Sequence, residues 1–271
     1  MKIVSVSTSD RGGGAERLAW IQPRAVLARS DDAWLLVGEK KGDDPRDVAL
    51  HESDRFDYRP YEGPVTRLGL PALRAGAERL GLEDFHHPYS RRLVEITGSA
   101  PDLVFCHNLH GGFFDPRILP WLSGRIPVVL VLHDRWSFTG HCAFAAGCER
   151  WEHGCGACPD LDAPPRVRRD ATRWNWRRKA RIWRRSRIHV MSASAAMLEE
   201  ASRSSLAPAI AEARVVPNAV DPARFRPGDR AAARRALAIP EHARVVLFVA
   251  NGTFENPQKA GGTVRAVARR L

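Results

Sequence analysis

The sequence predicts an α/β fold built on a Rossmann-like, doubly wound parallel sheet. The chain opens with the apolar run KIVSVS (2–7), which breaks at the glycine cluster RGGGAE (11–16) before a helix-compatible segment. A strand, a glycine-rich turn and a helix in this order begin doubly wound domains. Two later runs, PDLVFCH (101–107) and IPVVLVLH (126–133), are largely apolar and rich in valine and leucine, as buried parallel strands are.

The elements between these runs follow from local patterns. The first helix is expected from Ala15 to about Leu27, and a second strand at DAWLLVGE (32–39). Residues 41–66 are polar with scattered glycine and proline, which predicts a loop. Leucine and alanine recur at helical spacing between 68 and 80, and DPRILPWLSG (115–124) has the length and glycine stop of a short helix.

The alternation of strands and helices continues beyond these runs. The arginine-rich segment 166–187 is expected to hold a helix. SRIHVMSAS (186–194) predicts a strand and AAMLEEAS (195–202) a helix. Ser192 or Ser194 can cap that helix, because a serine hydroxyl accepts a hydrogen bond from a free backbone N–H.

Two domains are expected, with residues 1–215 forming the first, Rossmann-like domain. Residues 216–271 begin with a linker rich in Pro, Asn and Asp, followed by a helix at 229–240 and a strand at ARVVLFVAN (243–251). This segment is expected to be the truncated start of a second Rossmann-like domain. A lone strand and helix cannot bury both faces of a new sheet, so the strand either joins the first sheet or belongs to a domain present only in part.

The composition is typical of a globular protein without membrane-spanning segments. The chain has 271 residues, of which 44% are apolar and 27% charged. No apolar run approaches the roughly 18 residues that span a bilayer, and the N-terminus lacks a signal-peptide pattern, so a cytoplasmic location is expected. The net charge of +11 favours an anionic partner such as a nucleotide, a membrane surface or nucleic acid, or else reflects only a solvated surface.

Glycines and histidines at predicted strand ends are the first site candidates. The run Gly12–Gly14 follows the first strand, where free N–H groups at a helix start can bind phosphate, although a tight turn without a ligand is the alternative. The spacing does not match the G-x-G-x-x-G pattern of nicotinamide dinucleotide sites. His107 and His133 each end an apolar strand, and His110 lies on the loop after His107. Ligands of open α/β sheets bind beyond the carboxyl ends of the strands.

Four cysteines gather in the loop 141–159: Cys142, Cys148, Cys155 and Cys158. They contain one C-x-x-C pair, and the gap between the first two is wider than usual zinc spacing. They could hold a structural zinc, remain free thiols, or form two disulfides, which a reducing compartment disfavours. A catalytic zinc is disfavoured because no ligand position is left open for water. His141 and His153 could replace a cysteine ligand, whereas Cys106 is expected to be a small buried apolar residue.

The arginine-rich helix carries an apolar stripe. Trp176, Ala180 and Trp183 stand at positions i, i+4 and i+7, which places them on one side of a helix. The stripe can face the core with the arginines outward, or lie on a membrane surface, where tryptophan and arginine are common. Stacking on nucleic-acid bases is a third interpretation, but no known nucleic-acid-binding motif accompanies the stripe.

Four segments together resemble glycosyltransferase family 4. They are MKIVSVSTSDRGGGAERLAW, PDLVFCHNLHGG, VVLVLHDRWSFTGHCAFAAGCERWEHGCGACP and VVPNAVDPARFRP. The cysteine-bearing block resembles the bacterial exopolysaccharide branch of the family, which includes colanic-acid-type enzymes. The resemblance spans nearly the whole chain, and the third and fourth segments are the specific ones.

The resemblance implies a GT-B fold, in which two Rossmann-like domains face a cleft. The N-terminal domain would bind the acceptor mainly, with His107 and His110 as candidate acceptor-binding residues, and the C-terminal domain would hold the nucleotide-sugar donor. The enzyme would retain the anomeric configuration without a catalytic metal. Its acceptor would be a glycan or a lipid-linked sugar in surface polysaccharide biosynthesis, which would suit the inner face of the cell membrane.

The same resemblance assigns roles to individual residues. Gly12, Gly13 and Gly14 would lie against the donor diphosphate. His133 would match the histidine beside the donor sugar, which makes it the candidate catalytic residue. Lys259 would match the lysine that neutralises the leaving diphosphate, because a fixed cation stabilises charge that grows in the transition state.

Two departures from the family pattern concern the donor side. The family carries an arginine a few residues before this lysine, where the chain has Asn251 and Gly252, and Arg265 comes too late. The paired glutamates that grip the donor, E-x7-E, lie beyond residue 271 in relatives. The chain is therefore expected to be a fragment of a longer protein or a non-catalytic remnant.

The alternative from another functional class is a zinc-stabilised nucleic-acid-binding protein. It would account for the positive charge and the cysteines. It gives no role to the glycine turn or to the two histidines at strand ends, so nucleic acid is the less favoured partner.

Overall fold

The computed structural model describes residues 1–28, 32–50, 70–145, 147–249 and 261–270. The chain divides into two compact units, Met1–Asn218 and Ala219–Leu271. Among the described residues, no helix is both long and apolar enough to cross a membrane.

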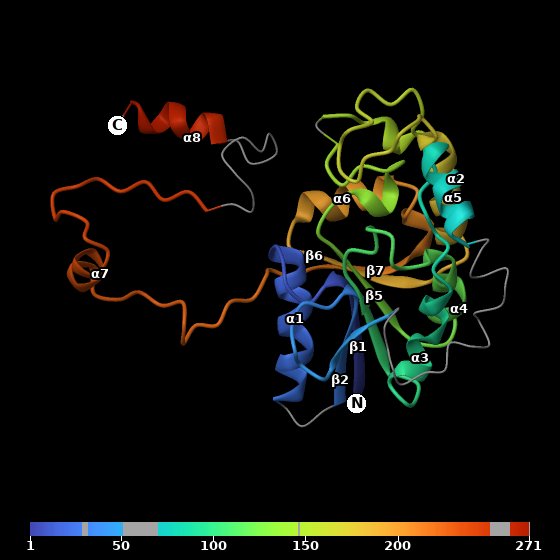
Figure 1. Ribbon diagram of the computed structural model, residues 1–271, viewed down its shortest axis with the longest axis horizontal. Helices are drawn as coiled ribbons and strands as arrows, with labels where there is room; N and C mark the ends of the chain where they lie inside the picture. Colours follow the sequence, from blue (N-terminus) through green and yellow to red (C-terminus); the bar gives the residue numbers. More distant parts are fainter. Residues whose placement is uncertain (29–31, 51–69, 146, 250–260, 271) are drawn as a thin grey trace. The chain divides into compact units, whose positions relative to one another are not determined.

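A seven-stranded parallel sheet forms the centre of the first unit (Figure 1). The strand order is β3-β2-β1-β4-β5-β6-β7, so the chain adds strands on one side of β1 and then on the other. This doubly wound order is that of a Rossmann-like sheet and confirms the predicted fold class. The strands are β1 (Lys2–Ser9), β2 (Asp32–Glu39), β3 (Asp47–Ala49), β4 (Leu103–Cys106), β5 (Val128–Leu132), β6 (Ile188–Ser192) and β7 (Ile210–Val215).

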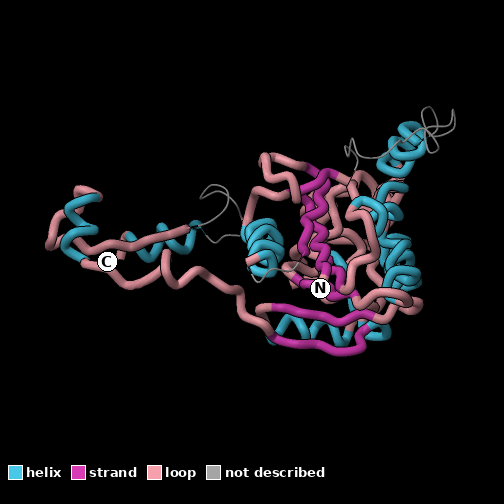
Figure 2. The backbone as a smooth tube through the Cα atoms, turned by 90° about the horizontal axis from the view of Figure 1, so that it is seen from below, coloured by secondary structure: helices cyan, strands magenta, loops and turns pink. Residues whose placement is uncertain are grey.

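Helices cover both sides of this sheet, as Figures 1 and 2 show. Helix α1 (Gly14–Leu27) packs against β1 and β2, and α6 (Ala195–Arg203) packs against β6 and β7. The remaining helices of the first unit lie across the sheet from α1 (Figure 1): α2 (Leu70–Arg79), α3 (Leu93–Ile96), α4 (Leu119–Ser123) and α5 (Thr172–Trp183). Short 3-10 turns connect them: η3 (Pro88–Arg92), η4 (Pro116–Ile118), η5 (Trp136–Phe138), η6 (Arg150–Glu152) and η7 (Ala207–Ala209).

The central strands are buried on both faces. Val4, Val6, Val104 and Leu130 are each at most 2% exposed, which explains why the central strands are largely apolar instead of alternating with polar residues. Cys106 is fully buried in β4, as predicted, and burial raises the pKa of its thiol to about 12. The core therefore follows from the apolar runs read in the sequence.

Helix α5 turns its apolar stripe toward the core, so the core-facing interpretation is confirmed. Ala180 and Trp183 are buried, and the indole N–H of Trp176 donates to the carbonyl of Trp151 at 2.8 Å. The same inward face also buries Lys179, which the stripe did not indicate.

Helix α6 begins as predicted. The hydroxyl of Ser194 accepts a hydrogen bond from the backbone N–H of Met197 at 3.3 Å, and Ser194 is the N-cap. Ser192 instead donates its hydroxyl to the carbonyl of Leu132 at 3.1 Å, which ties the end of β6 to β5.

The loop predicted at 41–66 contains a strand. Residues Asp47–Ala49 form β3, which pairs in parallel with β2. Asp47 is buried in this strand and is paired with Arg24 of α1 at 2.8 Å. A three-residue edge strand that begins with an acidic residue has no apolar period to reveal it. Residues 51–66 lie outside the described residues.

The strand predicted at 243–251 is absent from the part that the structure describes. Residues 243–249 adopt no regular structure, and Val245, Leu247 and Val249 are more than half exposed. The described part of the second unit contains two helices, α7 (Arg230–Ala236) and α8 (Gly261–Ala268), and no strand. A strand needs a neighbour to satisfy its backbone groups, and the described residues of this unit supply none.

Candidate functional site

The carboxyl ends of neighbouring strands carry two of the candidate histidines. Strands β1, β4 and β5 are adjacent, and the order of strand addition reverses between β1 and β4. In doubly wound sheets, ligands bind at this switch point. His107 directly follows β4, and His133 directly follows β5, so the fold places both at the end of the sheet where ligands bind.

The imidazole rings of these two histidines stack and share a hydrogen bond. The ring centroids are 5.2 Å apart with an interplanar angle of 13°, and His107 Nδ1 is 2.9 Å from His133 Nε2. His107 Nε2 lies 2.9 Å from the side-chain oxygen of Gln22 on α1. Because that oxygen can only accept, His107 carries its proton on Nε2, and His133 donates from Nε2 to His107. His133 Nδ1 is left as an acceptor, and no described residue donates to it.

Burial keeps both rings neutral at physiological pH. His107 is 4% exposed, and burial together with the neighbouring His133 lowers the pKa of its imidazole to about 3. Burial also lowers the pKa of His133, although the carboxylates of Asp134 and Glu16 act in the opposite direction. His133 is therefore a neutral hydrogen-bonding group and not a fixed cation.

The low pKa of His107 makes folding stability depend on pH. Below pH 6.5 the unfolded chain takes up a proton at this residue, while the folded protein does so only near pH 3. The free energy of unfolding is therefore expected to fall as the pH drops through this window. From pH 7.5 to 5.5 the loss attributable to one such site is about 1 kcal/mol.

Urea unfolding of the wild type and of His107→Gln at these two pH values measures this contribution. The variant should lose less stability on acidification than the wild type, by about 1 kcal/mol. An identical pH dependence in both proteins would contradict the assignment.

The glycine turn follows β1, at the same end of the parallel sheet as His133. Helix α1 begins at Gly14, and Gly13 is its N-cap with extended backbone. Glu16, in the first turn, accepts a hydrogen bond from the hydroxyl of Thr8 on β1 at 2.8 Å and is near enough to influence the pKa of His133. A methyl group on Gly14 would meet no atom within 4 Å. The space beside the start of α1 is thus open to a ligand, and the fold itself does not require glycine at this position.

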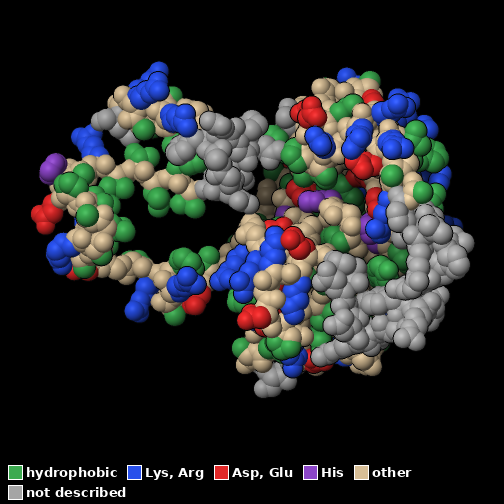
Figure 3. Space-filling view, in the orientation of Figure 1, with side chains coloured by type: hydrophobic (Ala, Val, Ile, Leu, Met, Phe, Trp, Pro, Cys, Tyr) green, Lys and Arg blue, Asp and Glu red, His purple; other side chains and the backbone are tan. Residues whose placement is uncertain are grey.

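A cleft of about 930 Å³, open to solvent, adjoins the loop after β4. In Figure 3, histidine side chains gather in a hollow of this unit. His110 lines the cleft, and its Nε2 is 3.0 Å from a carboxylate oxygen of Asp134. The other oxygen of Asp134 accepts the backbone N–H of Trp136 at 2.9 Å. Asp134, the residue after His133, therefore orients the ring of His110 at the cleft wall.

A buried ion pair supports this wall from behind. Lys179 of α5 is 1% exposed, and its ammonium group lies 3.0 Å from the carboxylate of Glu83. It also donates to the carbonyl of Trp136 at 2.8 Å and lies 4.1 Å from the centroid of the Trp136 ring. Burial lowers the pKa of Lys179, and Glu83 opposes that change. The pair fixes η5 and the segment around Glu83 to α5.

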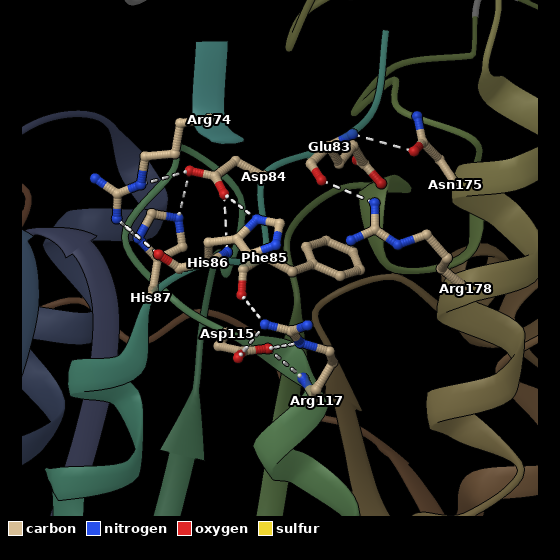
Figure 4. Close-up of polar contacts among 10 residues, drawn as sticks. All are labelled: Arg74, Glu83, Asp84, Phe85, His86, His87, Asp115, Arg117, Asn175 and Arg178. Atoms are coloured by element: carbon tan, nitrogen blue, oxygen red, sulfur yellow. Dashed lines mark hydrogen bonds and ion pairs between the residues drawn. The ribbon is translucent and has the colours of Figure 1, made fainter. Parts of the chain in front are cut away.

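Asp84 organises a second polar cluster at the same cleft (Figure 4). Its carboxylate contacts Arg74 at 3.2 Å and His87 at 3.2 Å, and it accepts the backbone N–H of His86 at 2.8 Å. Burial alone would raise the pKa of Asp84, but these hydrogen bonds and charges outweigh it and hold the pKa well below its usual range. Asp84 is thus a permanent anion that fixes Arg74 of α2 at the edge of the cleft.

The four cysteines of the loop 141–159 line one small cavity of about 300 Å³. His141 joins them, with Nε2 3.5 Å from the sulfur of Cys158, whereas His153 is exposed. All are free thiols, so neither of the two disulfides considered from the sequence is formed. Burial raises the pKa of Cys155 to about 12 and also raises those of Cys142 and Cys158.

The donor set as it stands does not fit a zinc ion. Among the described residues, no three His, Cys, Asp or Glu side chains are arranged so that they could hold one metal ion. The shared cavity shows that the cysteines converge, but not that they coordinate. The structural zinc therefore stays a prediction, and metal analysis of the purified protein is the direct check.

Comparison with known proteins gives one partial match to a curated protein. No family model matches the chain. Over 100 residues the chain is 42% identical to an Escherichia coli (strain K12) protein described as a candidate colanic acid biosynthesis glycosyl transferase, WcaC. The match is to a glycosyltransferase of polysaccharide synthesis. It covers 34% of this chain, and the chain spans about 25% of the length of that relative.

The structure brings together only some of the predicted site residues. His107, His133 and the start of α1 converge at the switch point, and His110 lies at the adjacent cleft. Gly12 also lies at this turn, where an added methyl group would come within 3.2 Å of the Glu16 side chain. Lys259, with Asn251 and Gly252, lies outside the described residues.

Sequence reasoning missed three residues that shape the site: Gln22, Glu83 and Lys179. Gln22 follows an ordinary helical pattern, and Lys179 sits among arginines that are mostly exposed. One signal was available for Lys179. It stands between Trp176 and Trp183 at helical spacing, next to the buried stripe, where a charged residue requires a partner.

Proposed function

We propose that the protein is a retaining glycosyltransferase, which moves a sugar from a nucleotide-sugar donor to a glycan or lipid-linked acceptor in surface polysaccharide biosynthesis. The partial identity to WcaC supports the general activity. The observation that carries the proposal is the position of His133. Its neutral, half-buried imidazole directly follows β5 at the end of the sheet where ligands bind, and its Nδ1 is available to a ligand.

In this proposal the donor diphosphate lies against the start of α1. The backbone N–H groups after Gly12, Gly13 and Gly14 favour negative charge, because the first turn of a helix leaves its donors free. Lys259 is proposed to neutralise the leaving diphosphate. No metal is assigned to the chemistry.

His133 is proposed to contact the sugar as its anomeric centre becomes oxocarbenium-like. A neutral ring with an acceptor nitrogen can bind a sugar hydroxyl without placing a positive charge beside the developing cation. His107 is buried with both ring nitrogens occupied, so it is proposed as a positioning residue for His133 and not as a direct acceptor contact. His110, at the cleft, remains the proposed acceptor-binding histidine.

The direct test is turnover with a panel of nucleoside diphosphate sugars and lipid-linked or glycan acceptors. Release of the nucleoside diphosphate, together with transfer of labelled sugar, is the expected result. The anomeric configuration of the product, read by NMR, tests retention. Because the glutamates expected to hold the donor would lie beyond residue 271, binding is measured on the full-length protein that contains this chain. Failure of that protein to bind any of these donors at millimolar concentration by calorimetry would contradict the proposal.

Gly14→Ala is expected to weaken donor binding without harming the fold. The added methyl group meets no protein atom within 4 Å, so it occupies only space available to the ligand. The apparent affinity for the sugar nucleotide should fall by about tenfold, the cost of losing roughly one good contact. The free energy of unfolding should be unchanged or higher by up to about 1 kcal/mol.

The matched control is Gly76→Ala in α2, where an added methyl group also meets nothing within 4 Å. It should leave donor affinity unchanged. Equal donor affinities of the Gly14 variant and the wild type would show that the start of α1 is not part of the donor site.

A further inference from the structure

A second cleft lies between the η4–α4 segment and α5, away from the paired histidines. It encloses about 790 Å³, open to solvent, and its charged lining is entirely basic. No aspartate or glutamate is among the residues that line it: Phe85, Arg117, Pro120, Trp174, Arg178, Arg181, Ile182 and Arg185. We call it the arginine groove.

Two of its arginines are held rigidly around Phe85, as Figure 4 shows. Arg178 donates to the carbonyl of Glu83 at 2.9 Å and stacks 4.0 Å from the centroid of the Phe85 ring. Arg117 donates to the carbonyl of Phe85 at 2.7 Å and to Asp115 at 2.8 Å. These contacts fix the direction of both guanidinium groups before any ligand arrives, which lowers the entropy cost of binding.

The other two arginines have unused charge. Within the described part of the chain, no carboxylate pairs with the exposed side chains of Arg181 and Arg185. Among the described residues, Arg117 alone of the four groove arginines forms an ion pair with an acid, Asp115. Glu83, Asp84 and Asp115 act electrostatically on Arg178, and Asp115 pairs with Arg117. The groove nevertheless gathers four guanidinium groups in a concave surface, which favours an anion.

We propose that the arginine groove binds a phosphate group. Planar guanidinium forks match the oxygens of a phosphate in bidentate geometry better than an ammonium group does. Trp174, 50% exposed, lines the same groove and offers an apolar face to whatever carries the phosphate. The site is separate from the proposed donor site at the start of α1, and it does not depend on the proposed sugar transfer.

The phosphate can come from a soluble phosphate ester or from a lipid headgroup. Trp121, adjacent to Pro120, is 44% exposed, and Arg125 stacks 5.0 Å from its ring centroid. Exposed tryptophan with arginine is common at membrane interfaces. The test therefore has a soluble arm and a vesicle arm.

The test uses Arg181→Gln with Arg185→Gln, two exposed positions without carboxylate partners in the described residues. The matched control is Arg177→Gln with Arg184→Gln, which removes the same charge from exposed positions nearby that do not line the groove. Binding of inorganic pyrophosphate is measured by calorimetry. Binding to vesicles of phosphatidylcholine with about 30% phosphatidylglycerol is measured by cosedimentation against pure phosphatidylcholine.

The groove variant is expected to lose about tenfold or more in affinity, since charge-assisted hydrogen bonds are each worth roughly a factor of ten. The control should change by less than about threefold. Pyrophosphate binding identifies a soluble ligand, and binding to anionic vesicles alone identifies a headgroup.

Equal losses in both variants would overturn the proposal, because they would reflect net charge and not the groove. Absence of binding to both pyrophosphate and anionic vesicles would overturn it as well. An oligonucleotide serves as a further probe. If it binds the wild type more tightly than either phosphate probe and both variants lose equally, the basic helix is a general polyanion surface instead.

Discussion

Replacing His133 with alanine is expected to reduce the rate of sugar transfer by about 100-fold or more, because one preorganised polar contact to a developing charge is worth roughly 3 kcal/mol. The loss should appear in kcat and in kcat/KM together, since the contact strengthens in the transition state. Initial rates over a range of donor concentrations measure both quantities. This expectation rests on the proposed glycosyltransferase activity.

The matched variant for this position is His133→Gln. Alanine leaves His107 Nδ1 without a donor, which costs about 1–3 kcal/mol of stability for a buried group. A glutamine amide can donate to His107 from the place of the imidazole Nε2, so this variant should keep the stability of the pair. It lacks the second ring nitrogen, so its rate should fall by about 100-fold, as for alanine. A glutamine variant with wild-type rates would show that Nδ1 has no part in the reaction.

Lys179→Met is expected to lower the free energy of unfolding by about 3–5 kcal/mol, because removing one partner of a buried ion pair leaves the other charge uncompensated. The lysine is 1% exposed, and its loss leaves the buried carboxylate of Glu83, beside Trp136, without its cationic partner. Urea denaturation followed by circular dichroism measures the change. The cleft wall that contains His110 should also become less ordered, because Lys179 holds η5 in place.

The double variant Glu83→Gln with Lys179→Met separates charge from packing. It removes both charges, so it should recover at least about 1 kcal/mol relative to the single methionine variant. If Lys179→Met costs less than about 1 kcal/mol, the ion pair does not hold this part of the fold.

The sheet could be predicted because its signal is local. Strands β4 and β5 are buried on both faces, so they consist mainly of consecutive apolar residues that can be recognised in the sequence. The N-cap of α6 could be predicted from a single residue, Ser194. The short strand β3 could not be found this way, because its buried Asp47 depends on Arg24 of another element. At 243–251 the error was the reverse: a strand was expected, but residues 243–249 adopt no regular structure. An apolar run does not make a strand by itself, and the described residues of the second unit contain no strand with which it could pair.

The site was predicted in part, and for a similar reason. A histidine at the end of a buried strand must lie at the carboxyl edge of a parallel sheet, so His107 and His133 could be placed there without coordinates. Their mutual hydrogen bond and their low pKa values could not. These depend on ring orientation and on burial by segments distant in the sequence. The four cysteines were likewise expected in one loop, where they line one cavity, and the structural zinc stays a prediction.

By itself, the sequence determined the doubly wound parallel sheet and the positions of the strand-terminal histidines. It showed the apolar stripe of α5, but the structure decided that this stripe faces the core. Only the tertiary structure decided the partners of these residues. Gln22 lies 85 residues from His107, and Glu83 lies 96 residues from Lys179. The spacing of apolar residues along one helix or strand shows which of its faces is buried. Which polar group a buried side chain meets depends on how separate elements cross in space, and no local pattern carries that information.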